Sequence, residues 1–238
     1  MKNVAYIIKA LLRRGPGFVL LYARESLVFD LFHGTNTHLR VPKSEPAGAG
    51  TDCRDGVHYV ASLTSVIRRT LAVAEAALGK TRFQEAQFFD LGCGKGKTLL
   101  VYAMQYGRRT SHAAVGIEYE STLCEIARSN ARRLSLPGQG IQVHCDSALN
   151  IARYVKASLL VIYLYNPFGG QTLRSVLGVI AKYHHVLIYV DPVEQGVLLD
   201  FGYEVIESRQ GRHHADTWLV ALSRGTGTQP GDPDAGAT

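Results

Sequence analysis

The pattern of apolar and polar residues predicts strands that alternate with helices over most of the chain. Continuous apolar runs, typical of strands buried on both faces, cover residues 87–91, 113–117, 141–144, 159–165 and 186–190. Helical spacing of apolar residues separates several of them, at residues 98–106, 121–134 and 171–183. Two last runs, 203–208 and 217–222, predict an antiparallel pair. This order predicts an α/β fold with a doubly wound, mostly parallel seven-stranded sheet and an antiparallel strand near one edge.

The N-terminal third has a different pattern. Apolar residues at helical spacing predict helices over residues 2–14, 18–32 and 59–78, whereas residues 41–56 are rich in Pro, Gly and Ala. Residues 225–238 contain no residues able to form a core, and we expect them to be disordered. The expected organisation is an N-terminal helical extension with a loop or lid (1–56), the main α/β domain (57–224) and a tail (225–238).

A glycine-rich turn follows the first strand of the α/β domain. The strand ends at Asp90, and Gly92, Gly94 and Gly96 precede a helix. Glycines at such a turn let a ligand approach bare backbone N–H groups. A phosphate-binding P-loop would need glycine at position 91, which is leucine, and a nicotinamide fingerprint would need glycine at position 97, which is lysine. The turn therefore favours another bulky polar ligand.

Polar residues also follow three later strands. Glu118 lies 28 residues after Asp90, and a carboxylate there can accept two hydrogen bonds from a ligand. Asp146 with Ser147 follows the third strand. Asn166 begins Asn-Pro-Phe after the fourth strand, at the sheet edge where ligands of doubly wound folds bind.

Each of these residues also has a purely structural interpretation. Glu118 could be a charge at a helix N-terminus, and Asp146-Ser147 could cap the next helix. Asn166-Pro167 could be a chain reversal, an interpretation that we favour for Asp191-Pro192. Two pairs of adjacent histidines would point to opposite faces of a strand, and we expect no chelating role for them.

The motif Asp-x-Gly-x-Gly-x-Gly at residues 90–96 resembles the first motif of class I methyltransferases that use S-adenosylmethionine (SAM). The resemblance covers roughly residues 87–222, and Gly-Ile-Glu and Tyr-Asn-Pro-Phe are similar to motifs of bacterial methyltransferases of unassigned substrate. Residues 25–37 and 58–62 resemble the same group. The latter segment is similar to a Tyr-x-Pro-Ser/Thr element that contacts SAM, with Ala61 in place of the proline.

The resemblance implies a SAM-dependent methyltransferase with a Rossmann-like domain. It implies that the cofactor contacts Tyr59, Asp90, Gly92, Gly94, Gly96, Glu118, Asp146 and Ser147. In this interpretation Glu118 accepts hydrogen bonds from both ribose hydroxyls, and Asp146 binds the exocyclic amine of adenine. Asn166 is the expected catalytic residue, orienting the acceptor, and Phe168 is expected to pack against the acceptor. The expected acceptor is a nitrogen of a protein side chain or a small metabolite, with oxygen as the alternative acceptor atom. The alternatives are a nucleic-acid methyltransferase and a non-catalytic SAM-binding regulator.

Composition and charge give little information on whether the protein binds nucleic acid, metal or membrane. The formal net charge is +6, but no basic stripe typical of nucleic-acid binding is evident, and the four cysteines lack the spacing of a zinc site or a disulfide framework. A reducing cytoplasm is the expected compartment. No apolar run is long enough to span a bilayer. Residues 2–14 combine an apolar stripe with Lys2, Lys9, Arg13 and Arg14, so they are expected to pack on the domain, with contact to a membrane surface as the alternative.

Overall fold

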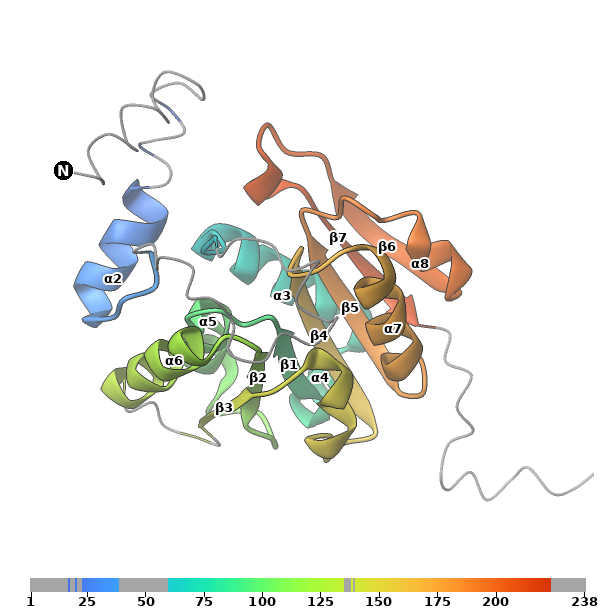
Figure 1. Cartoon of the computed structure of the whole chain (residues 1–238), viewed down its shortest axis with the longest axis horizontal. Helices are drawn as coiled ribbons and strands as arrows, with labels where there is room; N and C mark the ends of the chain where they lie inside the picture. Colours follow the sequence, from blue (N-terminus) through green and yellow to red (C-terminus); the bar gives the residue numbers. More distant parts are fainter. Residues whose placement is uncertain are drawn as a thin grey trace, which may run out of the picture.

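The computed structural model describes residues 17, 20, 23–38, 60–134, 138 and 140–223. Its centre is a seven-stranded sheet of order β3-β2-β1-β4-β5-β7-β6 (Figure 1). The strands are β1 (Gln87–Leu91), β2 (Ala114–Glu118), β3 (Ile141–Cys145), β4 (Leu159–Tyr165), β5 (His184–Val190), β6 (Tyr203–Arg209) and β7 (Trp218–Ser223). The predicted fold class is confirmed.

Most neighbouring strands run parallel, and only β7 runs antiparallel to its neighbours β5 and β6. The chain winds outward from β1 through β2 to β3, then returns to β4 on the other side of β1. In doubly wound sheets, ligands bind at the carboxyl ends of the two strands where the order reverses. These strands are β1 and β4.

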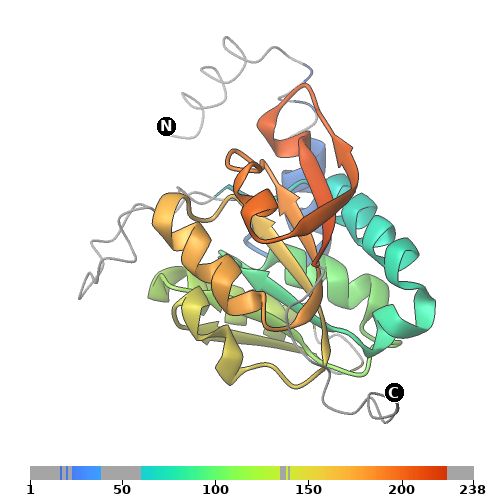
Figure 2. The same ribbon diagram turned by 90° about the vertical axis from the view of Figure 1, so that its right-hand side faces the viewer.

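Helices cover both faces of the sheet, and Figure 2 shows α3 and α7 on opposite sides. One apolar core contains residues of α3 (Thr64–Leu78), α4 (Lys80–Glu85) and α5 (Lys97–Tyr106). The other contains residues of η3 (Ala148–Arg153), α7 (Gly170–Ile180) and α8 (Val197–Asp200). Successive residues of β4 alternate between the two cores, as the period-two geometry of a strand requires. Its long apolar run is thus explained by burial on both faces.

Most predicted elements differ from the observed ones only at their ends. The largest difference is α3, which begins at Thr64 rather than at residue 59, since Leu63 is extended. Four short helices, α4, η3, α8 and η4 (His214–Asp216), were not predicted, because segments of three to six residues hold too few apolar positions to show a helical period. Helix α6 (Ser121–Leu134) has the predicted bounds.

The predicted helix over residues 18–32 is described at residue 20 and from residue 23 onward. It forms η1 (Ala23–Leu27) and α2 (Val28–His33), and Gly34 ends it in the left-handed conformation. We call residues 23–38 the strap, because they connect α3 to α6 by contacts described below. Residues 1–16, 41–56 and 225–238 lie outside the described residues, together with the predictions made for them.

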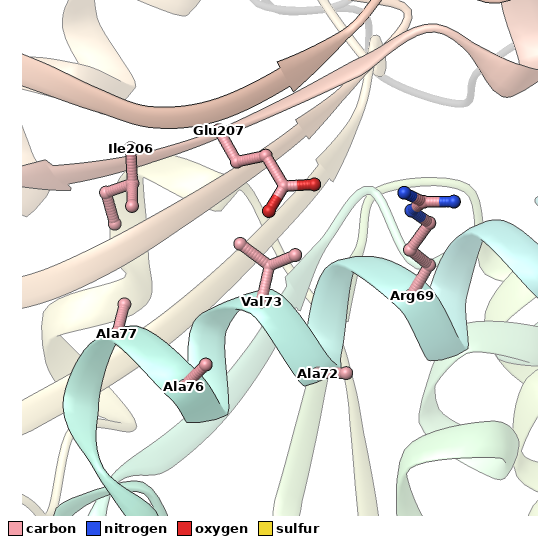
Figure 3. Close-up of a pocket in the computed structure, with 7 residues that line it drawn as sticks. All are labelled: Arg69, Ala72, Val73, Ala76, Ala77, Ile206 and Glu207. Carbon is pink, nitrogen blue, oxygen red and sulfur yellow. The ribbon is translucent and has the colours of Figure 1, made fainter.

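The edge strand β6 lies over α3 and leaves a shallow open depression between them (Figure 3). Its apolar lining comes from Ala72, Val73, Ala76, Ala77 and Ile206, with Arg69 and Glu207 as charged members. Strands β5 and β7 separate β6 from β4, so this depression is distinct from the ligand edge at β1 and β4. Among the helices of the described segments, none combines the length and apolar character needed to cross a bilayer.

Candidate functional site

The glycine turn after β1 meets the loop after β4. Gly92, Gly94 and Gly96 have φ angles of 76°, 53° and 80°, a region that side chains rarely adopt. A Cβ atom at Gly92 would lie 2.4 Å from Cβ of Pro167. Glycine at this position thus lets the two loops touch, which brings Asn166 to the same part of the sheet edge as the glycine turn.

The Glu118 carboxylate lies at the end of β2 and holds the glycine turn. Its Oε2 accepts a hydrogen bond from the Gly94 N–H at 2.8 Å, and its Oε1 accepts one from the Glu120 N–H at 2.9 Å. Burial raises the pKa of Glu118, although backbone hydrogen bonds from Gly94, Tyr119 and Glu120 favour the charged form. A carboxylate has about four acceptor sites, so one remains for a hydrogen bond from a ligand hydroxyl.

Asp90 lies beneath the turn, only 3% exposed. Burial raises its pKa to about 8, against a hydrogen bond from Thr98, and the charge of Glu118 adds to the rise. The hydroxyl of Tyr163 on β4 also lies near Asp90 and donates a hydrogen bond at 3.3 Å to Ser62, just before α3. A buried polar cluster thus joins the glycine turn, the central strand and the segment that precedes α3.

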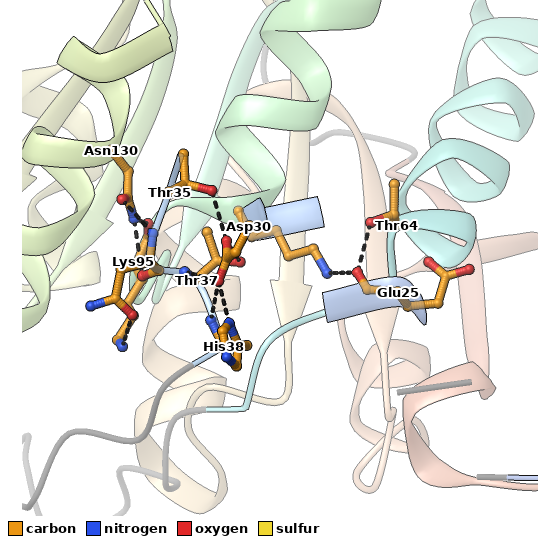
Figure 4. Close-up of polar contacts among 10 residues, drawn as sticks. Glu25, Asp30, Thr35, Thr37, His38, Thr64, Lys95 and Asn130 are labelled. Carbon is orange, nitrogen blue, oxygen red and sulfur yellow. Dashed lines mark hydrogen bonds and ion pairs between the residues drawn. The ribbon is translucent and has the colours of Figure 1, made fainter. Parts of the chain in front are cut away.

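Both lysines of the glycine turn donate hydrogen bonds to the strap, and Lys95 is labelled in Figure 4. Nζ of Lys95 donates to Oδ1 of Asn36 at 3.1 Å, and Nζ of Lys97 donates to the backbone carbonyl of Glu25 at 2.7 Å. Lys97 also lies 5.3 Å above the ring of Phe29. In a P-loop the lysine would reach a bound phosphate instead. These contacts agree with the conclusion that the turn is not a P-loop, which the sequence analysis drew from Leu91 at the position of a required glycine.

Asp30 organises the turn at the end of the strap. Its carboxylate accepts hydrogen bonds from the side chains of Thr35 and Thr37 at 2.7 and 2.8 Å, and from the backbone N–H groups of Thr37 and His38 at 2.7 and 3.0 Å. It also pairs with the His38 ring. Burial would raise the pKa of Asp30, but these hydrogen bonds outweigh it and lower the pKa. The sequence interpretation assigned no role to this hub.

Asp146 and Ser147 follow β3 and both contact η3. The Asp146 carboxylate accepts hydrogen bonds from the Ser147 N–H, the Asn150 side chain and the Tyr154 hydroxyl, at 2.8, 2.7 and 2.7 Å. Burial would raise the pKa of Asp146, but these bonds outweigh it and lower the pKa. Oγ of Ser147 accepts from the Leu149 N–H at 3.3 Å and caps η3. Both residues lie at the carboxyl end of β3, on the same edge of the sheet as the glycine turn. Their contact with adenine stays a prediction.

Asn166 and Asp191 end the adjacent strands β4 and β5 and contact each other. Nδ2 of Asn166 donates to Oδ2 of Asp191 at 3.3 Å, and Oδ1 of Asp191 lies 3.3 Å from Nδ1 of His214. Asn166 and Asp191 have φ angles of 37° and 50°, the left-handed region that non-glycine residues occupy under strain. The sequence analysis placed His214 on a strand and assigned it no role, because adjacent histidines on a strand point to opposite faces; the structure instead places it in η4 (His214–Asp216), beside Asp191.

The remaining expected site residues differ in location. Phe168 is 8% exposed and belongs to the core on the α7 face, so its ring lies beneath the loop rather than at its rim. Tyr59 lies outside the described residues, immediately before Val60. Residues that the sequence analysis missed are Thr98, Tyr163, Asp30 and Asn130. The only signal for them was a polar residue inside an apolar pattern, which does not identify a partner.

Comparisons with known proteins add the following findings. No family model and no curated protein matches the chain. Solved structures that match include magnesium protoporphyrin IX methyltransferase from Synechocystis PCC 6803 with bound SAM, at 12% identity over 87% of this chain and 96% of that chain, with a TM-score of 0.48. An rRNA methylase from Streptococcus thermophilus matches at 14% identity over 68% and 95%, with a TM-score of 0.45. A ribosomal protein L11 methylase from Lactobacillus delbrueckii subsp. bulgaricus matches at 13% identity over 66% and 79%, with a TM-score of 0.45. At these values the functional argument rests on the chain's own motifs and site geometry.

Proposed function

We propose that this protein is a SAM-dependent methyltransferase that modifies a nitrogen of a protein side chain or a small molecule. The observation that carries the proposal is the acidic lining of the glycine turn. The Gly94 N–H, which a phosphate-binding loop would turn toward its ligand, is bonded to the Glu118 carboxylate. Asp90 lies beneath the same turn, but its pKa of about 8 leaves it protonated at pH 7, so the negative charge at the turn comes from Glu118. A carboxylate at this place repels phosphates and suits a cationic ligand that carries ribose hydroxyls.

Two groups of residues divide the proposed work. The cofactor half consists of the glycine turn, Glu118, Asp146 and Ser147, at the ends of β1, β2 and β3. The acceptor half consists of Asn166, Asp191 and His214, at the ends of β4 and β5 and before β7. Contact between Gly92 and Pro167 joins the two halves. A methyl donor held by the first half would therefore face an acceptor held by the second.

SAM supplies a methyl group on a positively charged sulfur. The acceptor nitrogen bonds to the methyl carbon as the bond from that carbon to sulfur breaks, and the electron pair of the broken bond stays on sulfur. Asn166 orients the nitrogen, and such alignment supplies much of the rate enhancement in a displacement of this kind. The His214 side chain is 82% exposed and paired with Asp191, so its other ring nitrogen can accept the proton that the acceptor loses.

Calorimetric titration with SAM, its demethylated product, ATP and NAD tests the cofactor. We expect binding of the first two and none of the last two. Glu118→Ala should weaken SAM binding by about 1.5–3 kcal/mol, the range for hydrogen bonds to a charged group. Glu125→Ala removes an exposed carboxylate of α6 and serves as the matched control. Tight ATP binding without a response to SAM would refute the proposal.

Transfer of labelled methyl from SAM to a cell extract tests catalysis. We expect label in material that is sensitive to protease or in small molecules. Label that is lost only on nuclease treatment would move the protein to the nucleic-acid methyltransferases. Binding of SAM without any transfer would favour a regulatory protein.

A further inference from the structure

We infer that the strap is part of the cofactor site and positions the glycine turn for SAM, an inference that rests on the proposed function. The strap spans α3 and α6 across the beginning of α5, the helix that follows the turn (Figure 4). Oε2 of Glu25 accepts the Ser65 N–H at 3.0 Å in the first turn of α3. At its other end, Asn36 contacts Asn130 of α6.

Asn130 is the residue that joins strap and turn. Its Oδ1 accepts the Asn36 N–H at 2.9 Å, while its Nδ2 donates to the Asn36 carbonyl at 3.2 Å and to the Lys95 carbonyl at 3.0 Å. The side chain is 2% exposed, so these bonds form away from water. One amide group therefore fixes the backbone of the strap and the backbone inside the glycine turn at the same time.

The two lysines give the turn a second connection to the strap. Lys97 is 2% exposed, and burial lowers its pKa to about 8, with the opposing charges of Glu25 and Asp30 limiting the fall. Burying an ammonium group is unfavourable unless hydrogen bonds compensate. The Glu25 carbonyl supplies such a bond from the strap. A lysine needed only to continue α5 would leave its charge in water.

The strap end is rigid enough to transmit this positioning. The four consecutive backbone N–H groups of residues 35–38 all have acceptors: Asp30 for Thr35, Thr37 and His38, and Asn130 for Asn36. Displacing the turn would therefore strain or break bonds of the Asp30 hub. Because coupling between two sites is reciprocal, a strap that raises SAM affinity must itself be stabilised by SAM.

The test uses Asn130→Ala, with Arg133→Ala as the matched control. Arg133 also lies on α6 and donates to the strap, to the Gly34 carbonyl at 2.9 Å, but its side chain is exposed, and no bond from it to the glycine turn is among those described. We expect Asn130→Ala to weaken SAM binding about tenfold and Arg133→Ala to change it less than about twofold. In the wild type, saturating SAM should slow hydrogen exchange of the N–H groups of residues 35–38, and Asn130→Ala should abolish that effect.

The outcomes separate this inference from the proposed function. If the wild type does not bind SAM, the proposed function fails. If the wild type binds SAM, but Asn130→Ala binds it equally well and SAM leaves exchange at residues 35–38 unchanged, the strap is only structural and the inference fails. If Asn130→Ala does not fold, Lys97→Met takes its place, since it keeps the apolar stem and removes the ammonium bound to Glu25. The same loss of affinity and of exchange protection is then expected, and normal values would overturn the inference.

Discussion

The cofactor half and the acceptor half of the candidate site are built in different ways. In the first, Glu118 and Asp146 are held by several short hydrogen bonds, and the strap fixes the glycine turn from outside. In the second, Asn166 and Asp191 adopt left-handed conformations, their mutual bond is 3.3 Å long, and His214 is exposed. This difference suits a site with two ligands: the first half would bind a cofactor of constant structure, and the second half would bind a variable acceptor. Strain and exposure are concentrated where chemistry with a variable partner would occur.

The contact between the halves gives the largest expected effect. In Gly92→Ala the new methyl group would lie 2.4 Å from the Pro167 side chain, so one of the loops must move. We expect methyl transfer to fall about 100-fold, since misplacement by about 1 Å can have that effect, together with weaker SAM binding. Gly79→Ala is the control, because its φ of 78° matches but nothing lies within 4 Å of the added atom. Equal losses in both variants would show that backbone strain, rather than the contact, matters.

The buried carboxylate of the cofactor half predicts a dependence of stability on pH. The pKa of Asp90 is raised from 3.8 to about 8, so between these values the folded state binds a proton that the unfolded state lacks. Asp90 should therefore contribute a decrease of about 2 kcal/mol or more in the free energy of unfolding as pH rises from about 4 to about 8, opposed between about 4 and 6.5 by buried His185, whose pKa is lowered to about 4. Urea unfolding of Asp90→Asn should lack this decrease, whereas Asp200→Asn, an exposed aspartate paired with Arg174, should retain it. Parallel pH profiles for the wild type and Asp90→Asn would contradict the assignment.

Removing the amide of the acceptor half should affect rate rather than binding. We expect Asn166→Ala to keep near-normal SAM affinity and to slow single-turnover transfer about tenfold or more, once an acceptor has been identified from labelled extract. Asn150→Ala is its counterpart in the cofactor half, since Asn150 donates to Asp146 as Asn166 donates to Asp191. That variant should alter SAM affinity and leave the rate of the bound complex unchanged. A normal single-turnover rate with a lower melting temperature would make Asn166 a turn residue only.

The smallest expected effect concerns Asp146. Because its carboxylate already accepts four hydrogen bonds within the chain, including one from Arg153, Asp146→Asn should lower stability by about 1 kcal/mol. If it also binds adenine, SAM affinity should fall a few-fold, as calorimetry can measure. Unchanged affinity in a destabilised variant would assign Asp146 to the cap of η3 alone.

The two halves also differ in how far the sequence predicted them. Strands β1 and β4 were predicted because continuous apolar runs are a local signal. The glycine turn was predicted because the spacing of its glycines is also local. Glu118 and Asn166 were placed at one sheet edge because parallel strands end together. The bonds from Asn130 to Asn36, 94 residues apart, and from Tyr163 to Ser62, 101 residues apart, depend on packing that no local pattern encodes. The 3.3 Å pairing of Asp191 with His214 also required the fold.

The bulged edge strand β6 has a consequence for the protein in crowded solution. A regular strand with an open edge is a template on which another molecule can extend the sheet. In β6 the pairing with β7 is irregular between Val205 and Glu207, and a bulge of this kind twists the edge away from a flat ladder. Glu204, Glu207 and Arg209 add exposed charges along the same strand. An incoming strand would have to desolvate these charges, so the edge opposes the stacking of chains into aggregates.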